Sequence, residues 1–499
     1  MSSATVPLHP GSPAEFTLVR EFFRQADFQD ATLCRVLSLG DMSDLGRVQW
    51  ANAGLESLSP SLRWCLQTFV RGLPSAEDQA RTICGDAVFA AFHSLGLLRP
   101  SEKIPANCVC PVWVYPAVGF VIVTDRRDDP EGGELVPPED IVFPAIYAGT
   151  LRFLQLLPEA RGGDALDLCG GSGIGTLQLA RTARTATTAD LTRRSALFAE
   201  FNARLNGVDM LSLCGDLYAP VEGRQFDLIA AHPPFVPSMR TDMVYRDGGE
   251  TGEEITRRVI EGLPAHLRPG GTCMILCVAR DTKEQALEHR VREWLGSTAD
   301  EFDIIFGLEK ILSVEEVIDS LRKRGQQIAE DGARQLHERL HSLGTSQFVY
   351  GAIFIRRGHE SAAKEPCRVR LNLAGVAPDF EHLLQWRRFC RQPGFHEWLA
   401  AARPRLSPAL RLTIRHAVHE GSLVPADFVF EVEAGFHAAL RLDGWVVPLI
   451  AQLEGGKAVN EVYSAAMKEE KLPAGFKLEN FMELVRGMID RGFLSVETP

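Results

Sequence analysis

A basic charge excess, CxxC cysteine pairs and long apolar runs are all missing from this 499-residue sequence. The net charge of −12 argues against binding nucleic acid over a broad surface, because proteins of that kind carry a basic stripe. No two of the 11 cysteines form a CxxC pair, so neither a zinc knuckle nor a thioredoxin-type motif is supported. No apolar run reaches the roughly 18 residues of a membrane span. The first 15 residues lack the segments of a signal peptide, so we expect a soluble, cytoplasmic protein.

Composition and length indicate a globular chain of several domains. Hydrophobic residues make up 45% of the sequence and charged residues 24%, which is typical of folded proteins. At about 150 residues per domain, the length predicts two to four domains. We place an N-terminal helical domain with a β-hairpin at residues 1–140, an α/β domain at 141–358, and a third domain at 366–499. The polar segment His359–Pro366 links the last two.

Alternating strands and helices distinguish the central domain. Short apolar runs recur between segments of helical periodicity, and this alternation predicts a sheet with helices on both faces. A charged helical insertion at Ser313–Ser342 precedes the last strand. The predicted strands are Ala165–Cys169, Thr185–Asp190, Leu211–Asp216, Phe226–Ala231, Thr272–Ala279, Asp303–Phe306 and Phe348–Ile355.

The C-terminal domain is predicted to be mostly helical, with one strand at Phe428–Val432. Helices are expected near Trp445–Leu453, Val459–Met467 and Leu478–Arg491. Three short helices followed by an apolar tail favour a winged-helix-like module.

A glycine-rich turn is the most informative feature of the sequence. The run from Leu166 to Gly175 reads Leu-Asp-Leu-Cys-Gly-Gly-Ser-Gly-Ile-Gly, in which a buried strand enters a tight turn and a helix follows. Glycines in such a turn let the backbone approach a ligand closely. Asp167 stands directly before the turn, where it would repel a pyrophosphate. The turn therefore favours a neutral or cationic ligand.

Two further carboxylates end the next two predicted strands. Asp190 closes the second strand, where an acidic side chain can accept both hydroxyls of a ribose. Asp216 follows the third strand within Gly215-Asp216-Leu217. Taken alone, Asp190 fits a helix N-cap and Asp216 a turn residue. Taken together, the carboxyl ends of parallel strands form one crevice, which is the expected ligand site of an open α/β sheet.

At this point the chain resembles the class I methyltransferases that use S-adenosylmethionine, over about residues 140 to 357. The resemblance implies a Rossmann-like, seven-stranded methyltransferase domain. It implies that Asp167 and the turn hold the methionine part of the cofactor, Asp190 the ribose, and Asp216 with Leu217 the adenine. The residues assigned to the cofactor site are Asp167, Cys169, Gly170, Gly171, Gly173, Asp190, Leu191, Asp216, Leu217 and His232.

The fourth predicted strand ends in His232-Pro233-Pro234-Phe235. This is similar to the Asn-Pro-Pro-Tyr/Phe motif of the branch that contains the release-factor glutamine methyltransferases and the small-domain ribosomal RNA guanine methyltransferases. As in that branch, a loop follows at Val236–Glu250, and a helix then runs to Leu267–Gly271. The resemblance implies that the four motif residues form the catalytic turn.

The residue types of the motif also indicate its chemistry. Two prolines fix the backbone and leave carbonyl groups free to accept hydrogen bonds from an acceptor amine. Orientation of that amine toward the methyl group would then supply most of the rate. His232 replaces the usual asparagine, so it either orients an amine or acts as a general base for O-methylation. Phe235 can stack on a planar acceptor and face a cation.

The long loop after the motif is expected to cover the substrate, since functional residues concentrate on such loops. Within it, Tyr245 and Arg246 are candidate substrate contacts. Met239, Arg240, Asp242 and Met243 lie in the same loop. Phe143 and Tyr147, before the first strand, are candidate walls of the cofactor pocket or simply core residues.

One further motif has the spacing of a zinc site, but we do not expect it to bind a metal. His337-Glu338-Arg339-Leu340-His341 matches the zinc-binding pattern H-E-x-x-H. It lies in the charged insertion, and Arg339 stands between the histidines, where a cation disfavours a bound dication. We expect a solvated helix face and no metal.

Several functions remain open. We expect first the N-methylation of a small metabolite or natural-product intermediate. A protein glutamine, a peptide or an RNA base is the alternative acceptor; the others are an O-methyltransferase and a scaffold that binds the cofactor without catalysis. The segment Gly444–Glu497 faintly resembles modules that bind leader peptides, although a dimerisation domain is the reading we favour. Expected partners are therefore a small-molecule or peptide acceptor, with a homodimer possible and neither nucleic acid nor membrane expected.

Overall fold

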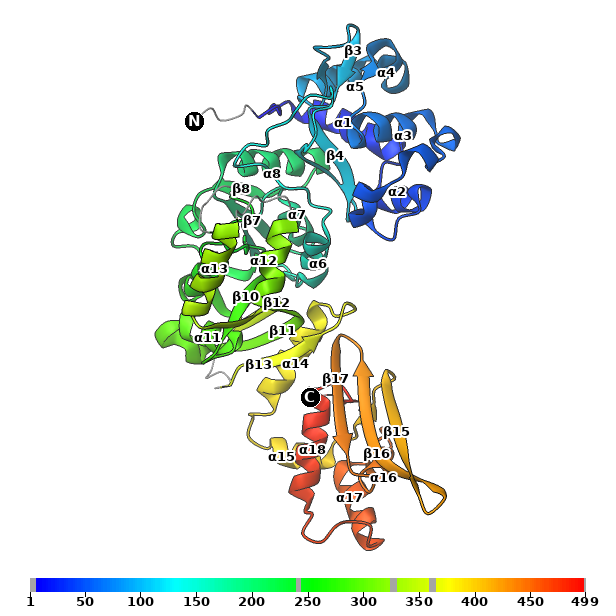
Figure 1. Cartoon of the computed structure of the whole chain (residues 1–499), viewed down its shortest axis with the longest axis vertical. Coiled ribbons are helices and arrows are strands. Elements are labelled where there is room, and N and C mark those ends of the chain that lie inside the picture. Colours follow the sequence, from blue (N-terminus) through cyan, green and yellow to red (C-terminus); the bar gives the residue numbers. More distant parts are fainter. Residues whose placement is uncertain (1–5, 239–243, 324–329, 359–364, 498–499) are drawn as a thin grey trace. The chain divides into compact units, whose positions relative to one another are not determined.

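A computed structural model describes residues 6–238, 244–323, 330–358 and 365–497 of the chain (Figure 1). These residues form two compact units, Met1–Ala279 and Arg280–Pro499, and each unit is described by itself. The three domain boundaries predicted from the sequence therefore remain a prediction. The loop residues Met239, Arg240, Asp242 and Met243 lie outside the described residues.

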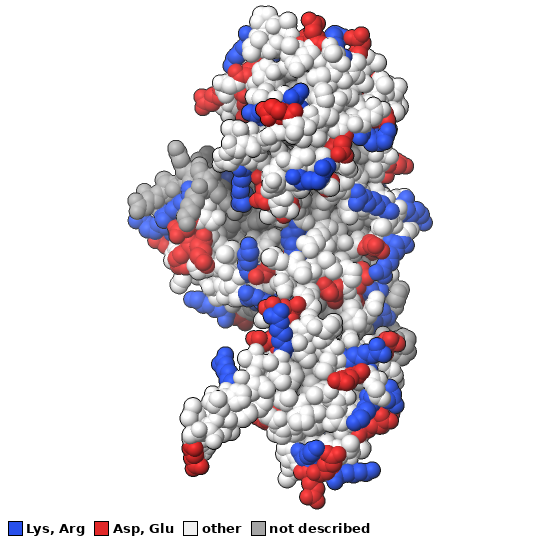
Figure 2. Space-filling view, turned by 90° about the vertical axis from the view of Figure 1, so that its right-hand side faces the viewer, with Lys and Arg blue, Asp and Glu red and all other residues white. Residues whose placement is uncertain are grey.

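Charged side chains of both signs are present on the surface of the protein. Lysine and arginine are interspersed with aspartate and glutamate on the face shown in Figure 2, where no continuous area of one sign covers the surface. Among the described residues, no helix combines the length and apolar character needed to cross a membrane.

Helices dominate the N-terminal part of the first unit. These are α1 (Pro13–Gln25), α2 (Asp30–Leu37), α3 (Pro60–Cys65), α4 (Glu77–Cys84) and α5 (Asp86–Ser94). The first begins where Ser12 and Glu15 form a reciprocal capping box ahead of the apolar face of the helix. Aromatic rings fill the core between the helices in edge-to-face pairs, such as Phe23 with Phe69 and Trp64 with Phe92.

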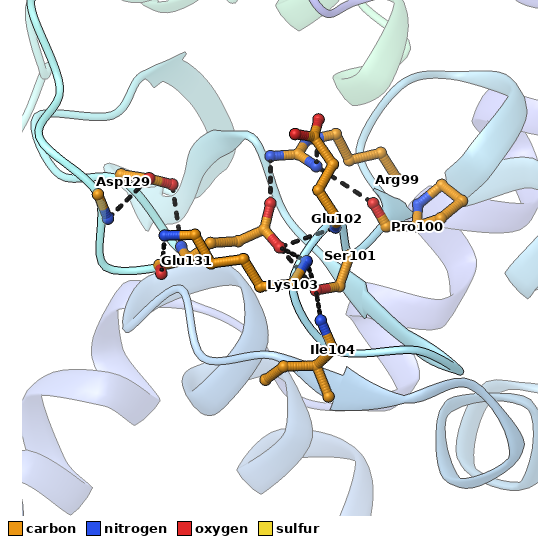
Figure 3. Close-up of polar contacts among 9 residues, drawn as sticks. Arg99, Pro100, Ser101, Glu102, Lys103, Ile104, Asp129 and Glu131 are labelled. Atoms are coloured by element: carbon orange, nitrogen blue, oxygen red, sulfur yellow. Dashed lines mark hydrogen bonds and ion pairs between the residues drawn. The ribbon is translucent and has the colours of Figure 1, made fainter.

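A glutamate with a buried side chain anchors the segment that leaves this helical region (Figure 3). Glu131 accepts hydrogen bonds from Ser101 Oγ at 2.6 Å, from the Glu102 backbone N–H at 2.9 Å and from Arg99 at 2.7 Å. The Ser101 hydroxyl and the other donors hold the pKa of Glu131 at about 2. The segment after residue 125 is therefore hydrogen-bonded to the rest of the unit.

A β-hairpin precedes that segment, where the sequence pattern predicts one. Strands β4 (Val112–Ala117) and β5 (Phe120–Asp125) pair in antiparallel register through Ala117 and Phe120. The two turn residues, Val118 and Gly119, both have positive φ, as the tight hairpin turn requires.

Five parallel strands form the sheet of the first unit, in the order β8-β7-β6-β9-β10. The strands are β6 (Asp164–Leu168), β7 (Thr185–Asp190), β8 (Leu211–Cys214), β9 (Phe226–Ala231) and β10 (Leu267–Thr282). Helices α6 (Ala148–Leu156), α7 (Ile174–Leu179), α8 (Arg193–Asn206), α9 (Glu254–Glu261) and α10 (Leu263–His266) connect or flank them. The near-continuous apolar strands, such as Phe226–Ala231, are buried, as parallel strands between helices require.

The second unit adds antiparallel strands. Strand β11 (Phe302–Leu312) pairs antiparallel with β12 (Thr345–Arg357) and parallel with β13 (Cys367–Leu371). The predicted charged insertion consists of two helices, α12 (Val314–Lys323) and α13 (Glu330–Ser342). Helix α11 (Leu287–Trp294) precedes β11. A Rossmann-like α/β fold with a large mixed sheet is thus confirmed.

The C-terminal region differs from its prediction. It contains helices α14 (Ala377–Phe389), α15 (Phe395–Ala401), α16 (Val447–Ile450), α17 (Val459–Lys468) and α18 (Leu478–Asp490). It also contains strands β15 (Leu410–His419), β16 (Ser422–Glu433) and β17 (Phe436–Leu442), which pair in sequence order and join β13 through β17. The expectation of a single strand at 428–432 is therefore wrong, and a winged helix is not confirmed. Leu410, Leu412 and Ile414 of β15 alternate with Arg411, Thr413 and Arg415, a period-two pattern typical of a strand that the helical prediction overlooked.

Candidate active site

The glycine-rich turn joins β6 to α7 in a conformation that its residues dictate. Cys169, Gly171 and Gly173 all have positive φ, the region that glycine enters without cost. A Cβ at Gly170 would overlap the Thr188 hydroxyl oxygen on the neighbouring strand. Gly170 is therefore required for packing, while Cys169 adopts a conformation that costs a non-glycine residue free energy.

Asp167 is the buried carboxylate of the site, with 2% of its surface exposed. It accepts a hydrogen bond from the Thr176 hydroxyl at 2.9 Å. Burial raises its pKa to about 7, because the charged form loses hydration. A Cβ at Gly175 would come within 2.5 Å of the Asp167 carboxylate oxygen, so Gly175 leaves that carboxylate its space. Such a group is poised to ionise beside a cationic ligand.

Asp190 ends β7 and holds the turn from the adjacent strand. Its carboxylate accepts hydrogen bonds from the backbone N–H of Gly171 at 2.9 Å and of Thr192 at 3.1 Å. Burial raises its pKa. The N-cap of α8 is Thr192, whose hydroxyl accepts from Ser195, so Asp190 is free of the capping role considered above. Leu191, beside it, is exposed.

Asp216 follows β8 and has a partner that the sequence did not reveal. Arg258 of α9 donates to its carboxylate at 2.7 Å, and both side chains are about half exposed. Leu217 is buried and has positive φ. Arg258 was not predicted as a partner of Asp216, because an arginine on an amphipathic helix is an ordinary surface residue.

Register places these groups on one edge of the sheet. Leu168 lies opposite Ala189 on one side and Ala231 on the other, and Asp190 lies opposite Cys214. The carboxyl ends of four strands therefore meet at the same edge. Asp167, Asp190, Asp216 and His232 all belong to these strand ends, as the sequence predicts.

His232 lies among aromatic rings. It stacks on Phe153 of α6 with ring centroids 5.3 Å apart and an interplanar angle of 19°. Phe235 of the same turn is tilted against it at 5.9 Å. Withdrawal from water lowers the pKa of His232 to about 4, so the imidazole is neutral at physiological pH. Phe153 was not singled out from the sequence, where it is one apolar residue of a helix.

The loop after the motif returns to lie against it. Val236 donates from its backbone N–H to the Arg246 carbonyl at 2.9 Å, and Gly248 donates to the Val236 carbonyl at 2.9 Å. A Cβ at Gly248 would come within 2.7 Å of the Pro234 carbonyl, so this close approach needs glycine. Arg246 itself forms an ion pair with the buried Asp247 at 2.7 Å.

Three stacked rings connect the loop to the entrance of α6. Tyr245 stacks on Phe143 at 4.7 Å, and Phe143 stacks on Tyr147 at 4.4 Å. The Tyr147 hydroxyl accepts a hydrogen bond from Arg127 at 2.9 Å. A Cβ at Gly149, near the start of α6, would lie 3.8 Å from the His232 ring. The candidate pocket walls and the candidate substrate residue Tyr245 thus form one aromatic group.

The H-E-x-x-H motif lies on α13. Its first histidine, His337, is within 3.2 Å of Glu315 on α12, and both side chains are exposed. Within the described ranges, no three histidine, cysteine, aspartate or glutamate side chains are grouped to hold a metal ion.

Comparison with known proteins finds matches to the central part of this chain. Residues 144–304 match the family model described as the methyltransferase small domain. The chain is 27% identical to the ribosomal protein uL3 glutamine methyltransferase of Bradyrhizobium diazoefficiens, over 34% of this chain and 60% of that protein. It is 25% identical to the ribosomal RNA small subunit methyltransferase C of Alcanivorax borkumensis, over 36% and 49%. It is 29% identical to the release factor glutamine methyltransferase of Deinococcus radiodurans, over 45% and 86%.

The match spans less than two thirds of the first two relatives, and the family model covers only the central part of this chain. What the comparisons establish therefore concerns the domain. The predicted resemblance, the enzyme class and its cofactor S-adenosylmethionine are confirmed at that level. Residues 144–304 are thus similar to the methyltransferase small-domain family.

Proposed function

We propose that this protein transfers a methyl group from S-adenosylmethionine to a nitrogen atom of a protein side chain held at the His232–Phe235 turn. The observation that carries the proposal is the position of that turn. It follows β9 at the sheet edge where the glycine-rich turn and Asp190 also lie, and its histidine is neutral and stacked on Phe153.

The residues around the glycine-rich turn suit the cofactor. The buried Asp167 offers a negative charge to the cationic methionine part, and Asp190 presents a carboxylate to the ribose. Asp216 with Leu217 faces the adenine once the exposed pair with Arg258 opens. S-adenosylmethionine, when bound there, supplies the methyl group on a sulfonium.

His232 acts in this proposal by orienting the acceptor. A neutral imidazole has one lone pair that accepts a hydrogen bond from an amide or amine N–H, as the usual asparagine oxygen does. A base whose pKa is about 4 has little driving force to remove a proton from a hydroxyl at neutral pH. N-methylation is therefore favoured over the O-methylation that the sequence left open.

The acceptor class comes from the named relatives and from charge. Two of the three are glutamine methyltransferases acting on proteins, and the third is named for ribosomal RNA. None supports the small-metabolite acceptor that sequence analysis placed first. A net charge of −12 and the mixed charge of the face in Figure 2 favour a protein acceptor over RNA. The 11 unpaired cysteines fit the reducing cytoplasm in which we place the protein.

Calorimetric titration of S-adenosylmethionine and S-adenosylhomocysteine tests the cofactor site. Wild type should bind both ligands, and Asp190→Ala should abolish detectable binding. Asp227→Ala is the matched control, since Asp227 lies at the start of β9, the opposite end from His232, and should leave binding intact. Absence of binding by folded wild-type protein would overturn the proposal.

Methyl transfer to ribosomal proteins, release factors and ribosomal RNA from labelled S-adenosylmethionine tests the acceptor. The label should enter protein and resist ribonuclease. His232→Asn should keep the activity, whereas His232→Ala should lose about 100-fold, the cost of a misplaced acceptor. Label in RNA would contradict the protein acceptor, and no label despite intact cofactor binding would favour the non-catalytic scaffold.

A further inference from the structure

The β15–β16 hairpin runs beyond the strands that support it. Strand β17 pairs with β16 only over Phe428–Glu433, whereas β15 pairs with β16 as far as His419 and Ser422. Residues 415–427 therefore form a two-stranded arm, visible beside β17 in Figure 1. A two-stranded hairpin with no third strand is marginally stable in water.

Strand β15 is also the edge of its sheet. Within the described part of the second unit its only strand partner is β16, and residues 411–419 are exposed. The single irregularity of the pair is Ala426, the extra residue on β16, so β15 itself is a continuous strand of ten residues. It contains no proline, and its outer N–H and C=O groups can pair with another strand.

Apolar side chains on β15 continue the inward face of the sheet out to this edge. Leu412 lies opposite the buried Phe430, and Leu410 lies opposite the buried Val432. Along the same face, Leu412, Ile414 and Val418 are 38%, 41% and 76% exposed. Leu423, opposite Val418 on β16, is 71% exposed. This row of apolar side chains lacks the cover that its inner neighbours have.

We propose that β15 pairs with β15 of a second copy of this chain, antiparallel and about a two-fold axis through Ile414. The pairing would join the sheets of the two copies edge to edge through their β15 strands. It would also bring the exposed apolar rows of both copies together on one face, since a two-fold axis perpendicular to the sheet keeps each face on its own side.

Charge and strand overlap together favour this register, because pairing about Ile414 engages residues 410–418 of both β15 strands. Registers centred on residue 411, 413 or 415 place arginine opposite arginine, which is destabilising. The register centred on Ile414 places Arg411 opposite Ala417 and Arg415 opposite Thr413. It also matches apolar residues across the axis. Its pairs on the apolar face are Leu410–Val418, Leu412–His416 and Ile414–Ile414. The strand is thus complementary to itself, which favours a second copy over a foreign strand.

Oligomeric state in solution tests the proposal, by sedimentation equilibrium on the full chain. Wild type should show twice the 55.0 kDa of one chain, and Ile414→Lys and Ile414→Glu should each be monomeric. Met467→Lys is the matched control, because Met467 is an exposed apolar residue of helix α17 and not of the sheet, and it should stay dimeric.

Mixing the two charge variants makes the test specific. Only the Ile414-centred register places residue 414 opposite residue 414, so the Lys and Glu variants together should restore the dimer as a heterodimer. This recovery also shows that neither variant is merely unfolded. A monomeric wild type, a dimer insensitive to Ile414→Lys, or a mixture that stays monomeric would each overturn the proposal.

Discussion

Three aspartates at one sheet edge differ in what surrounds them, and this difference sets their chemistry. Asp167 is buried with one hydroxyl partner, Asp190 is occupied by two backbone N–H groups, and Asp216 is exposed and paired with Arg258. The sequence shows three equivalent strand-end carboxylates. Burial and partners make one a titrating group, one a support of the turn and one half of a surface ion pair.

Asp167 should make cofactor binding depend on pH. Its pKa is about 7 in the free protein, and a cationic ligand favours its ionised form. Binding therefore releases a proton below about pH 7, and the affinity should fall by up to about tenfold for each pH unit below that value. Calorimetric titration of S-adenosylmethionine between pH 5.5 and 8.5 measures this change in affinity. Asp167→Asn should bind more weakly and without this dependence; an affinity of wild type that is flat with pH would contradict the assignment.

Arg258 should oppose cofactor binding slightly. If Asp216 contacts the adenine, the ion pair with Arg258 must open first, and exposed pairs are worth up to about 1 kcal/mol. Arg258→Ala should therefore tighten S-adenosylmethionine by up to about fivefold in a calorimetric titration. Weaker binding in this variant would mean that Arg258 contacts the ligand itself. Arg257→Ala, at an exposed i,i+4 pair on the same helix, is the control.

At the scale of elements, side chains of helix α8 bond the backbone of β5 at the edge of the hairpin, as a neighbouring strand would. Asn202 accepts from the Val123 N–H at 2.8 Å and donates to the Val123 carbonyl at 2.9 Å. Asn206 does the same for Val121, at 2.9 and 2.8 Å. Asn202 also donates to the Ser172 carbonyl in the glycine-rich turn at 2.9 Å. The helix thereby satisfies the edge of β5 and ties it to the cofactor turn.

The two asparagines should be separable by mutation. Asn202→Ala and Asn206→Ala both leave backbone groups of β5 unpaired, so each should lower the free energy of unfolding by about 1–3 kcal/mol in urea titrations. Only Asn202→Ala also frees the Ser172 carbonyl. It should weaken S-adenosylmethionine by about fivefold, while Asn206→Ala leaves the affinity unchanged. Equal effects of both variants on affinity would show that the turn is held by other contacts.

At the scale of the whole molecule, self-association would couple folding to concentration. Only folded chains can pair through β15. Mass action therefore stabilises the folded state as the protein concentration rises. The wild-type Tm should increase by about 1–3 °C for each tenfold rise in protein concentration. Ile414→Lys should show no such increase in the same scanning fluorimetry series. A concentration-independent wild-type Tm would argue against the dimer.

Sequence prediction was accurate where chain order alone carries the information. The glycine-rich turn, Asp190 and the His232–Phe235 motif each lie at the end of a short, mostly buried strand, and all seven predicted strands of the central region are present. Prediction failed at β15 and β17, whose alternating apolar and polar residues have the period-two pattern of a strand that the helical prediction overlooked. Partners from elsewhere in the chain were also missed, namely Phe153, Arg258 and Asn202.

The sequence by itself determined the class of this domain, because local patterns specify parallel strands and glycine allows the turn between β6 and α7. It also determined which residues end those strands. Tertiary structure alone decided their states. The pKa of Asp167 near 7, the neutral His232 and the engaged Asp216 all depend on burial and on side chains distant in sequence. Desolvation and hydrogen bonding are properties of the folded surroundings, which no spacing along the chain encodes directly.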